Sequence, residues 1–212
     1  MSRRLVNITL DNLSDLPTRC RECVYWELDP LAGERARDSG DAGLEKEAWV
    51  SDTLLEWGCC GQLVYVDGVP AGYVMYAPAA YVPRSIAFAT SPVSPDAVLL
   101  ITGRILPEFA GGGLGRMLLQ GVAREVLRRG IRAVEAFGRA NDGAPGPVTR
   151  GADYRCLLPA DYLRAVGFKT IRPHPVTPRL RLDVKTTATW REDVEYAIER
   201  LLGSMQSPAL SR

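Results

Sequence analysis

A run of glycines directly before a predicted helix is the part of the sequence best suited to bind a charged ligand. Residues 107–120 are PEFAGGGLGRMLLQ, with glycine at 111–113 and again at 115. Glycine weakens the start of a helix unless something must approach the backbone closely. The first amides of a helix have no internal acceptors and carry partial positive charge. The stretch therefore predicts a turn that can hold a phosphate group.

Two common nucleotide-binding motifs do not fit this turn. A dinucleotide-binding GxGxxG that begins at Gly111 would need glycine at position 116, where the chain has Arg116. No Gly-Lys-Ser or Gly-Lys-Thr follows, which excludes a P-loop. From the glycines alone, a plain tight connection between a strand and a helix remains the alternative.

The residues around the glycines resemble the central motif of the GNAT superfamily of acyl-CoA-dependent N-acetyltransferases. Residues 105–119, ILPEFAGGGLGRMLL, are similar to the pattern V-x-P-x-x-[RQ]-G-x-G-[ILV]-G-x-x-L-L on a strand, a loop and a helix. Residues 162–168, YLRAVGF, resemble the closing helix-to-strand motif, often Y-x-x-x-G-F. As architecture, the resemblance covers about residues 5–184.

The resemblance implies acetyl-CoA as cosubstrate and a role for each matched residue. Ile105 and Leu106 would hydrogen-bond the pantetheine arm and orient the thioester carbonyl, whose oxygen one free strand amide would polarise. The coenzyme A pyrophosphate would be wrapped mostly by the backbone of the turn, which consists of Ala110, Gly111, Gly112, Gly113, Leu114, Gly115 and Arg116.

Two positions depart from the family pattern. Ala110 stands where the family has Arg or Gln, so we expect one phosphate contact to be missing and coenzyme binding to be weaker. Leu163 stands where the family has the tyrosine that protonates the departing thiolate. Tyr162, one residue earlier and about 100° around a helix, is the candidate catalytic acid, and a core or surface tyrosine is the alternative.

The candidate base and acceptor contacts come from two strands. An amine must lose a proton before it attacks a thioester. Glu135, on the apolar face of a predicted strand, is the candidate catalytic base, although a salt bridge there would be equally consistent with the sequence. Arg104 interrupts the apolar strand before the turn: it would favour an acidic acceptor if it faces the acceptor, or be a sheet-edge charge if it faces outward.

The cysteines leave two further readings open. Cys20 and Cys23 have the CxxC spacing of redox and zinc sites, but the chain has no second CxxC or HxxxH pair. Five cysteines, an odd number, without a secretory signal argue against a disulfide framework. We expect ordinary structural thiols and no metal, with metal binding and redox activity as the alternatives.

Composition indicates an ordinary globular protein. Apolar residues make up 46% and charged residues 24% of 212, and the net charge of +1 gives no field that favours nucleic acid or membranes. The N-terminus lacks the apolar region of a signal peptide, and the most apolar window, 71–82, is too short to span a bilayer. We therefore expect a cytoplasmic protein.

The pattern of apolar residues predicts an α/β fold with a parallel strand-helix-strand step at 98–137. The resemblance makes this a GNAT-like, mixed and mostly antiparallel central sheet flanked by helices. The predicted elements are a strand at 6–10, a helix at 16–26, a loop at 26–43, a helix at 45–57, a hairpin at 61–68 and 69–76, a loop at 77–95, a strand at 96–106, a helix at 114–127, a strand at 131–137, a polar connection at 138–155, a helix at 159–166, an extended segment at 168–184 and an amphipathic helix at 190–205.

We thus expect one acetyltransferase-like domain at 1–185 and a C-terminal helical extension at 186–212. The function that the sequence favours is transfer of an acetyl group from acetyl-CoA to an amine by direct attack. The acceptor is a small molecule or a protein, and a homodimer is conceivable. The alternatives are a catalytically weak acyl-CoA-binding sensor or interaction module, and a CxxC metal or redox protein.

Overall fold

The computed structural model describes residues 2–140 and 156–184. Within them, the strands form one sheet in the order β1-β2-β3-β4-β5-β7-β6. Only β4 and β5 run parallel, and the other neighbours are antiparallel. The strands are β1 (Arg3–Asn7), β2 (Gly61–Val66), β3 (Val69–Ala77), β4 (Ala97–Ile105), β5 (Ala133–Phe137), β6 (Lys169–Arg172) and β7 (Arg179–Asp183).

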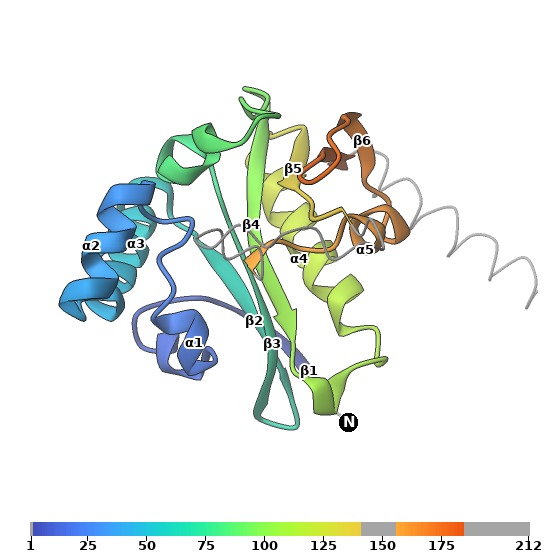
Figure 1. Ribbon diagram of the computed structural model, residues 1–212. Coiled ribbons are helices and arrows are strands. Elements are labelled where there is room, and N and C mark those ends of the chain that lie inside the picture. The colour runs from blue at the N-terminus through green and yellow to red at the C-terminus, as the bar shows by residue number, and fades with distance from the viewer. Residues whose placement is uncertain (1, 141–155, 185–212) are drawn as a thin grey trace, which may run out of the picture.

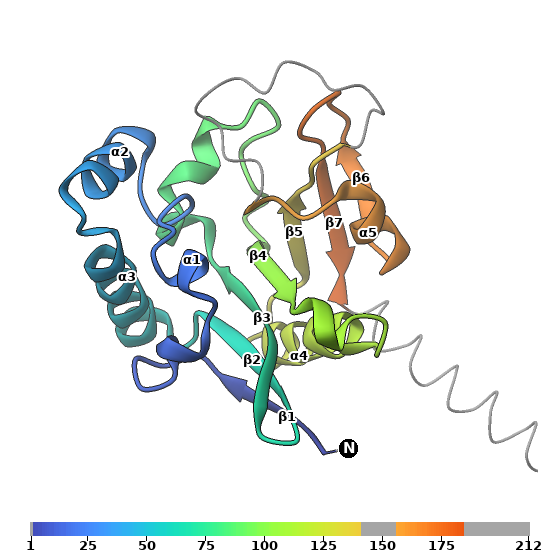
Figure 2. The same cartoon turned by 60° about the horizontal axis from the view of Figure 1, so that its bottom comes forward.

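Helices cover both faces of this sheet (Figures 1 and 2). On one face lie α1 (Thr18–Arg21), α2 (Pro30–Ser39) and α3 (Ala42–Trp57), and on the other lie α4 (Leu114–Arg128) and α5 (Ala160–Ala165). Short 3-10 turns connect them at Leu13–Asp15, Ala79–Tyr81, Pro83–Ala87 and Pro107–Phe109. Each face therefore has its own apolar layer, and the sheet lies between the two layers.

The helix α4 shows how the sequence builds one of these layers. Leu114, Leu118, Val122 and Val126 recur every four residues and are all buried, so they form a single apolar stripe against the sheet. The chain leaves the helix at Gly130, whose φ of 72° is a backbone conformation that glycine adopts without strain. The helix predicted at 114–127 is confirmed.

Other confirmed predictions are the hairpin, the strand at 96–106, the parallel step and the mixed, mostly antiparallel sheet. The helix predicted at 45–57 begins three residues earlier, at Ala42. The C-terminal helix at 190–205 and most of the connection at 138–155 lie outside the described residues, and the division at 185/186 stays a prediction. No helix among the described residues has the length and apolar character needed to cross a membrane.

Two predictions near the N-terminus are wrong. The helix expected at 16–26 is only the four residues of α1, because residues 24–26 turn inward and pack in the core instead of continuing the helix. The loop expected at 26–43 contains α2, which begins after Asp29, whose carboxylate accepts from the amides of Leu31 and Ala32. The buried positions of α2 are Gly33 and Ala36, so the helix has little apolar periodicity to detect.

The first strand also differs in position from the predicted 6–10. It covers Arg3–Asn7, because those residues pair in register with Val66 to Gln62 of β2. The chain leaves the sheet after Ile8, whose amide donates to the carbonyl of Gly61.

A buried ion pair joins α3 to the segment that follows α1. The Lys46 ammonium donates to the Glu27 carboxylate, and both side chains are at most 3% exposed. The second carboxylate oxygen of Glu27 accepts from the amide of Trp26. A buried carboxylate that loses its cation is strongly unfavourable, so this pair fixes the packing of α3 on the preceding segment.

We predict that Lys46→Met lowers the free energy of unfolding by about 3–5 kcal/mol, because it leaves the Glu27 carboxylate buried without its cation. The double variant Glu27→Gln/Lys46→Met removes both charges and recovers much of the loss. Urea denaturation followed by tryptophan fluorescence measures both effects. A Lys46→Met protein within about 1 kcal/mol of the parent would contradict this account.

Candidate functional site

The divergence of two parallel strands creates the candidate site. β4 pairs with β5 only at Ala97, Val98 and Leu99, whereas its other edge pairs with β3 as far as Ile105. The register with β3 shifts between Met75 and Tyr76, which leaves an extra residue in β4 and bends it there. In the described part of the chain, the edge of β4 beyond Leu99 that faces β5 therefore carries backbone groups that β5 does not pair.

The glycine turn follows at the end of this free edge. Gly111 and Gly113 have φ of 79° and 75°, and Gly113 is the N-cap of α4 without a side-chain hydrogen bond. Within the described residues, the amides of Gly111–Gly115 donate to no backbone carbonyl. The Arg3 guanidinium donates to the Gly112 carbonyl at 2.9 Å, which turns that oxygen back toward β1 and adds positive charge. The turn thus presents unpaired N–H groups at a helix N-terminus, an arrangement that favours an anion.

The strand edge and the turn line one cleft of about 560 Å³. It brings together most of the residues that the sequence singled out: Ile105, Ala110, Gly111, Gly113, Leu114, Gly115, Arg116 and Tyr162. Leu106 and Gly112 are not part of its lining, and the amide of Leu106 donates to the Ala71 carbonyl at 2.9 Å. Arg104 also lines the cleft and is exposed, so both sequence alternatives for it stay open.

The helix α5 directs Tyr162 toward the turn. Leu163, at the position of the family tyrosine, is fully buried in the core, whereas Tyr162 is 36% exposed. A Cβ placed on Gly115 would lie 2.5 Å from the Tyr162 hydroxyl, so the glycine leaves room for that group. Burial raises the pKa of Tyr162 above its ordinary value, which keeps the phenol protonated and able to donate a proton.

Glu135 lies away from the lining of this cleft. It is fully buried on β5, where its carboxylate accepts from Arg179 at 3.0 Å and from Arg181 at 3.2 Å. The amide of Ser94 also donates to it, at 3.2 Å. The carboxylate therefore ties β5 to β7 and to the segment before β4, as the salt-bridge alternative described, and its role as a base stays a prediction.

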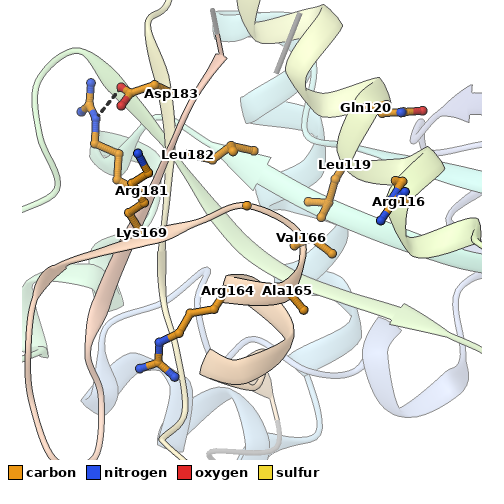
Figure 3. Close-up of a pocket in the computed structure, with 11 residues that line it drawn as sticks. Arg116, Leu119, Gln120, Arg164, Ala165, Val166, Lys169, Arg181, Leu182 and Asp183 are labelled. Carbon is orange, nitrogen blue, oxygen red and sulfur yellow. Dashed lines mark hydrogen bonds and ion pairs between the residues drawn. The ribbon is translucent and has the colours of Figure 1, made fainter. Parts of the chain in front are cut away.

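A second cavity of about 330 Å³ adjoins the cleft, and Arg116, Leu119 and Val166 line both. Figure 3 shows its apolar floor, with Leu119, Val166 and Leu182 between α4 and β7. Arg181 on its rim is neutralised by Asp183 and Asp96, whereas no ion pair within the described residues involves Lys169, which leaves a cation there. The cleft thus continues into a space that can hold a further flat or anionic group.

A third cavity, of about 450 Å³, lies on the α1–α3 side of the sheet and shares Tyr73, Gly103 and Arg104 with the cleft. Its lining also includes Arg139, which follows β5, and Cys156. Neither residue belongs to a sequence motif that would have predicted this position. The two cavities also share Leu158 and Pro159, so they adjoin each other where β4 diverges from β5.

Cys23 contacts Cys156 in this third cavity, with the two sulfur atoms 3.3 Å apart. The hydrogen bond from Cys156 is the main reason that the pKa of Cys23 is lowered to about 7, against the opposing effect of burial. Among the described residues, no group of three or more His, Cys, Asp and Glu side chains is placed to hold a metal ion.

Because the pKa of Cys23 is lowered to about 7, alkylation by iodoacetamide should be half-maximal near pH 7. Cys156→Ala removes the stabilising hydrogen bond, so we predict a rise in that pKa and a rate at pH 7 more than tenfold lower. Cys20→Ala is the matched control and should change the rate little. Tryptic cleavage after Arg21 separates the Cys20 and Cys23 peptides for mass spectrometry. An unchanged profile in Cys156→Ala would refute the assignment.

Solved structures resemble this chain in fold. The PaiA N-acetyltransferase of Thermoplasma acidophilum, solved in complex with coenzyme A, has a TM-score of 0.53 at 11% identity, over 86% of this chain and 99% of that one. The loading GNATL domain of CurA from Lyngbya majuscula has a TM-score of 0.54 at 14% identity, over 88% and 100%. YncA from Salmonella typhimurium, solved with its cofactor acetyl-CoA, has a TM-score of 0.52 at 15% identity, over 87% and 95%.

No curated protein matches the chain closely enough to count as a relative. The family model described as the acetyltransferase (GNAT) family matches residues 21–145, which include β4, the glycine turn and α4. Because this match covers more than half of the 212 residues, the chain belongs to the GNAT acetyltransferase family.

Proposed function

We propose that this protein transfers an acetyl group from acetyl-CoA to an amine. The observation that carries the proposal is the row of unpaired amides at Gly111–Gly115, directly after the free edge of β4. The turn holds the pyrophosphate, and the space beside β4 admits the pantetheine arm in an extended form. Coenzyme A complexes of proteins with this fold support the same assignment.

The second cavity suits the adenosine end of the coenzyme. It begins beside Arg116, at the far side of the turn from β4, and its floor is apolar as a base requires. Lys169 on its rim supplies a cation for the 3′-phosphate. Ala110 lacks a side-chain contact to phosphate, and Arg3, held at the Gly112 carbonyl, supplies positive charge to the same turn.

Acetyl-CoA supplies a thioester as acyl donor. The neutral amine forms the new N–C bond while the C–S bond breaks, the nitrogen loses a proton, and the departing thiolate gains one. An unpaired amide of β4 stabilises the charge that develops on the acyl oxygen. Tyr162, protonated and on the wall of the cleft, donates the proton to sulfur. For the base, Glu135 remains the prediction from the sequence.

We predict saturable binding of acetyl-CoA by calorimetry and amine-dependent release of coenzyme A across a panel of amines. Gly113→Ala places a methyl group in the open space at the turn, so it should raise the Kd at least tenfold. Gly130→Ala is the matched control, since it has the same positive φ and open surroundings at the other end of α4. The two variants should lose similar stability, about 1–2 kcal/mol.

Equal loss of binding in the two glycine variants would contradict the role of the turn. Binding of acetyl-CoA without acetylation of any amine would favour the sensor module over the enzyme. Absence of coenzyme binding in the parent protein would overturn the proposal itself.

We predict that Tyr162→Phe lowers kcat about 10–100-fold and leaves the Kd of acetyl-CoA within a factor of two, because the ring stays and only the acid is lost. Steady-state kinetics and calorimetry measure the two effects separately. A raised Kd with an unchanged kcat would show instead that the hydroxyl binds the coenzyme at the turn.

A further inference from the structure

The third cavity lies where the acceptor must approach. It shares Tyr73, Gly103 and Arg104 with the coenzyme cleft, beside the unpaired edge of β4. If the proposed function holds, the thioester lies along this edge, and an amine in the third cavity faces it. A volume of about 450 Å³ suits a small molecule more than a folded protein surface.

The charge of this cavity is unbalanced. Lys46 and Glu27 neutralise each other within it. Of the other lining groups, four are guanidinium groups and one is the carboxylate of Glu22, and within the described residues no ion pair involves any of them. The four guanidinium groups belong to Arg19, Arg37, Arg104 and Arg139.

Two of these arginines stand at the ends of the diverging strands. Arg104 is the residue before the last of β4, and Arg139 follows β5 by two residues. The backbone of Arg139 is fixed at both ends, since its amide donates to Leu158 and its carbonyl accepts from Ala160, each at 2.8 Å. Its side-chain Nε is buried without a hydrogen-bond partner among the described residues.

A buried donor without an acceptor is unfavourable, and an incoming anion would satisfy it. Guanidinium groups match carboxylates particularly well, because they can donate two parallel hydrogen bonds to one group. A cationic polyamine, in contrast, would meet four like charges here. We therefore favour the alternative in which Arg104 faces the acceptor, together with Arg139 from the end of β5.

We propose that the acceptor is a small amine that also carries a carboxylate, such as an amino acid with an acidic side chain. Arg104 and Arg139 bind the carboxylate and so direct the amine toward the edge of β4. The bonds made and broken are those of the proposed acetyl transfer.

The test compares L-glutamate with L-glutamate dimethyl ester and putrescine, which carry no carboxylate, as acceptors for the native protein. We expect kcat/KM for glutamate to exceed that for each of the others at least tenfold. Arg139→Gln should raise the KM for glutamate at least tenfold and lower the ratio of kcat/KM for glutamate to that for the ester. Arg139→Lys, which keeps the positive charge, should lower this ratio less. Arg132→Gln, an exposed arginine just before β5, is the matched control and should change neither.

The outcomes separate this inference from the proposed function. Preference for the ester or for putrescine, in a protein that binds acetyl-CoA and acetylates amines, would overturn the acidic acceptor alone. Acetylation confined to peptide amines would also overturn it. Failure to bind acetyl-CoA would overturn both. If Arg139→Gln does not fold, the comparison of glutamate with its ester on the native protein still decides the matter.

Discussion

The structure of the site depends on where β4 stops pairing with β5. Three residue pairs hold the two strands together, and beyond Leu99 they separate while β3 continues to support β4. Without that separation, the backbone groups on this edge of β4 would form hydrogen bonds with β5, and none would remain for a ligand. With it, one edge of a buried strand offers unpaired donors and acceptors next to a helix N-terminus, and an extended ligand can complete the sheet there.

The closed end of the two strands is reinforced by charge. Glu135, buried on β5 opposite Leu99, accepts from Arg179 and Arg181 of β7 and from the amide of Ser94. Breaking a buried ion pair of this kind leaves an uncompensated charge, so β5 is held firmly on its β7 side. The open end is left to Arg104, Arg139 and the glycine turn, which have groups available for ligands. The polar groups at one end of β4 and β5 are thus paired within the protein, whereas those at the other end can bind a ligand.

The sequence was sufficient for the elements whose signals are local. The apolar stripe of α4, the Asp67-Gly68 turn of the hairpin and the glycines before α4 each specify their structure within a few residues. α2 was missed because its buried face consists of small residues, although Asp29, Pro30 and Gly40 mark both its ends. No local pattern encodes contacts that depend on the order of the strands and on segments far apart in the sequence. Such contacts include the partners of Glu135, the contact of Cys23 with Cys156 and the position of Arg139.

The central claim is that the unpaired backbone of β4 and of the glycine turn receives the coenzyme. Amide hydrogen exchange with and without saturating acetyl-CoA measures this directly, because an N–H that donates to the ligand exchanges more slowly. Our account predicts that protection increases at residues 100–105 and 111–116 and changes little in β1, β2 and the exposed face of α3. Saturable binding that leaves those two segments unprotected would contradict it.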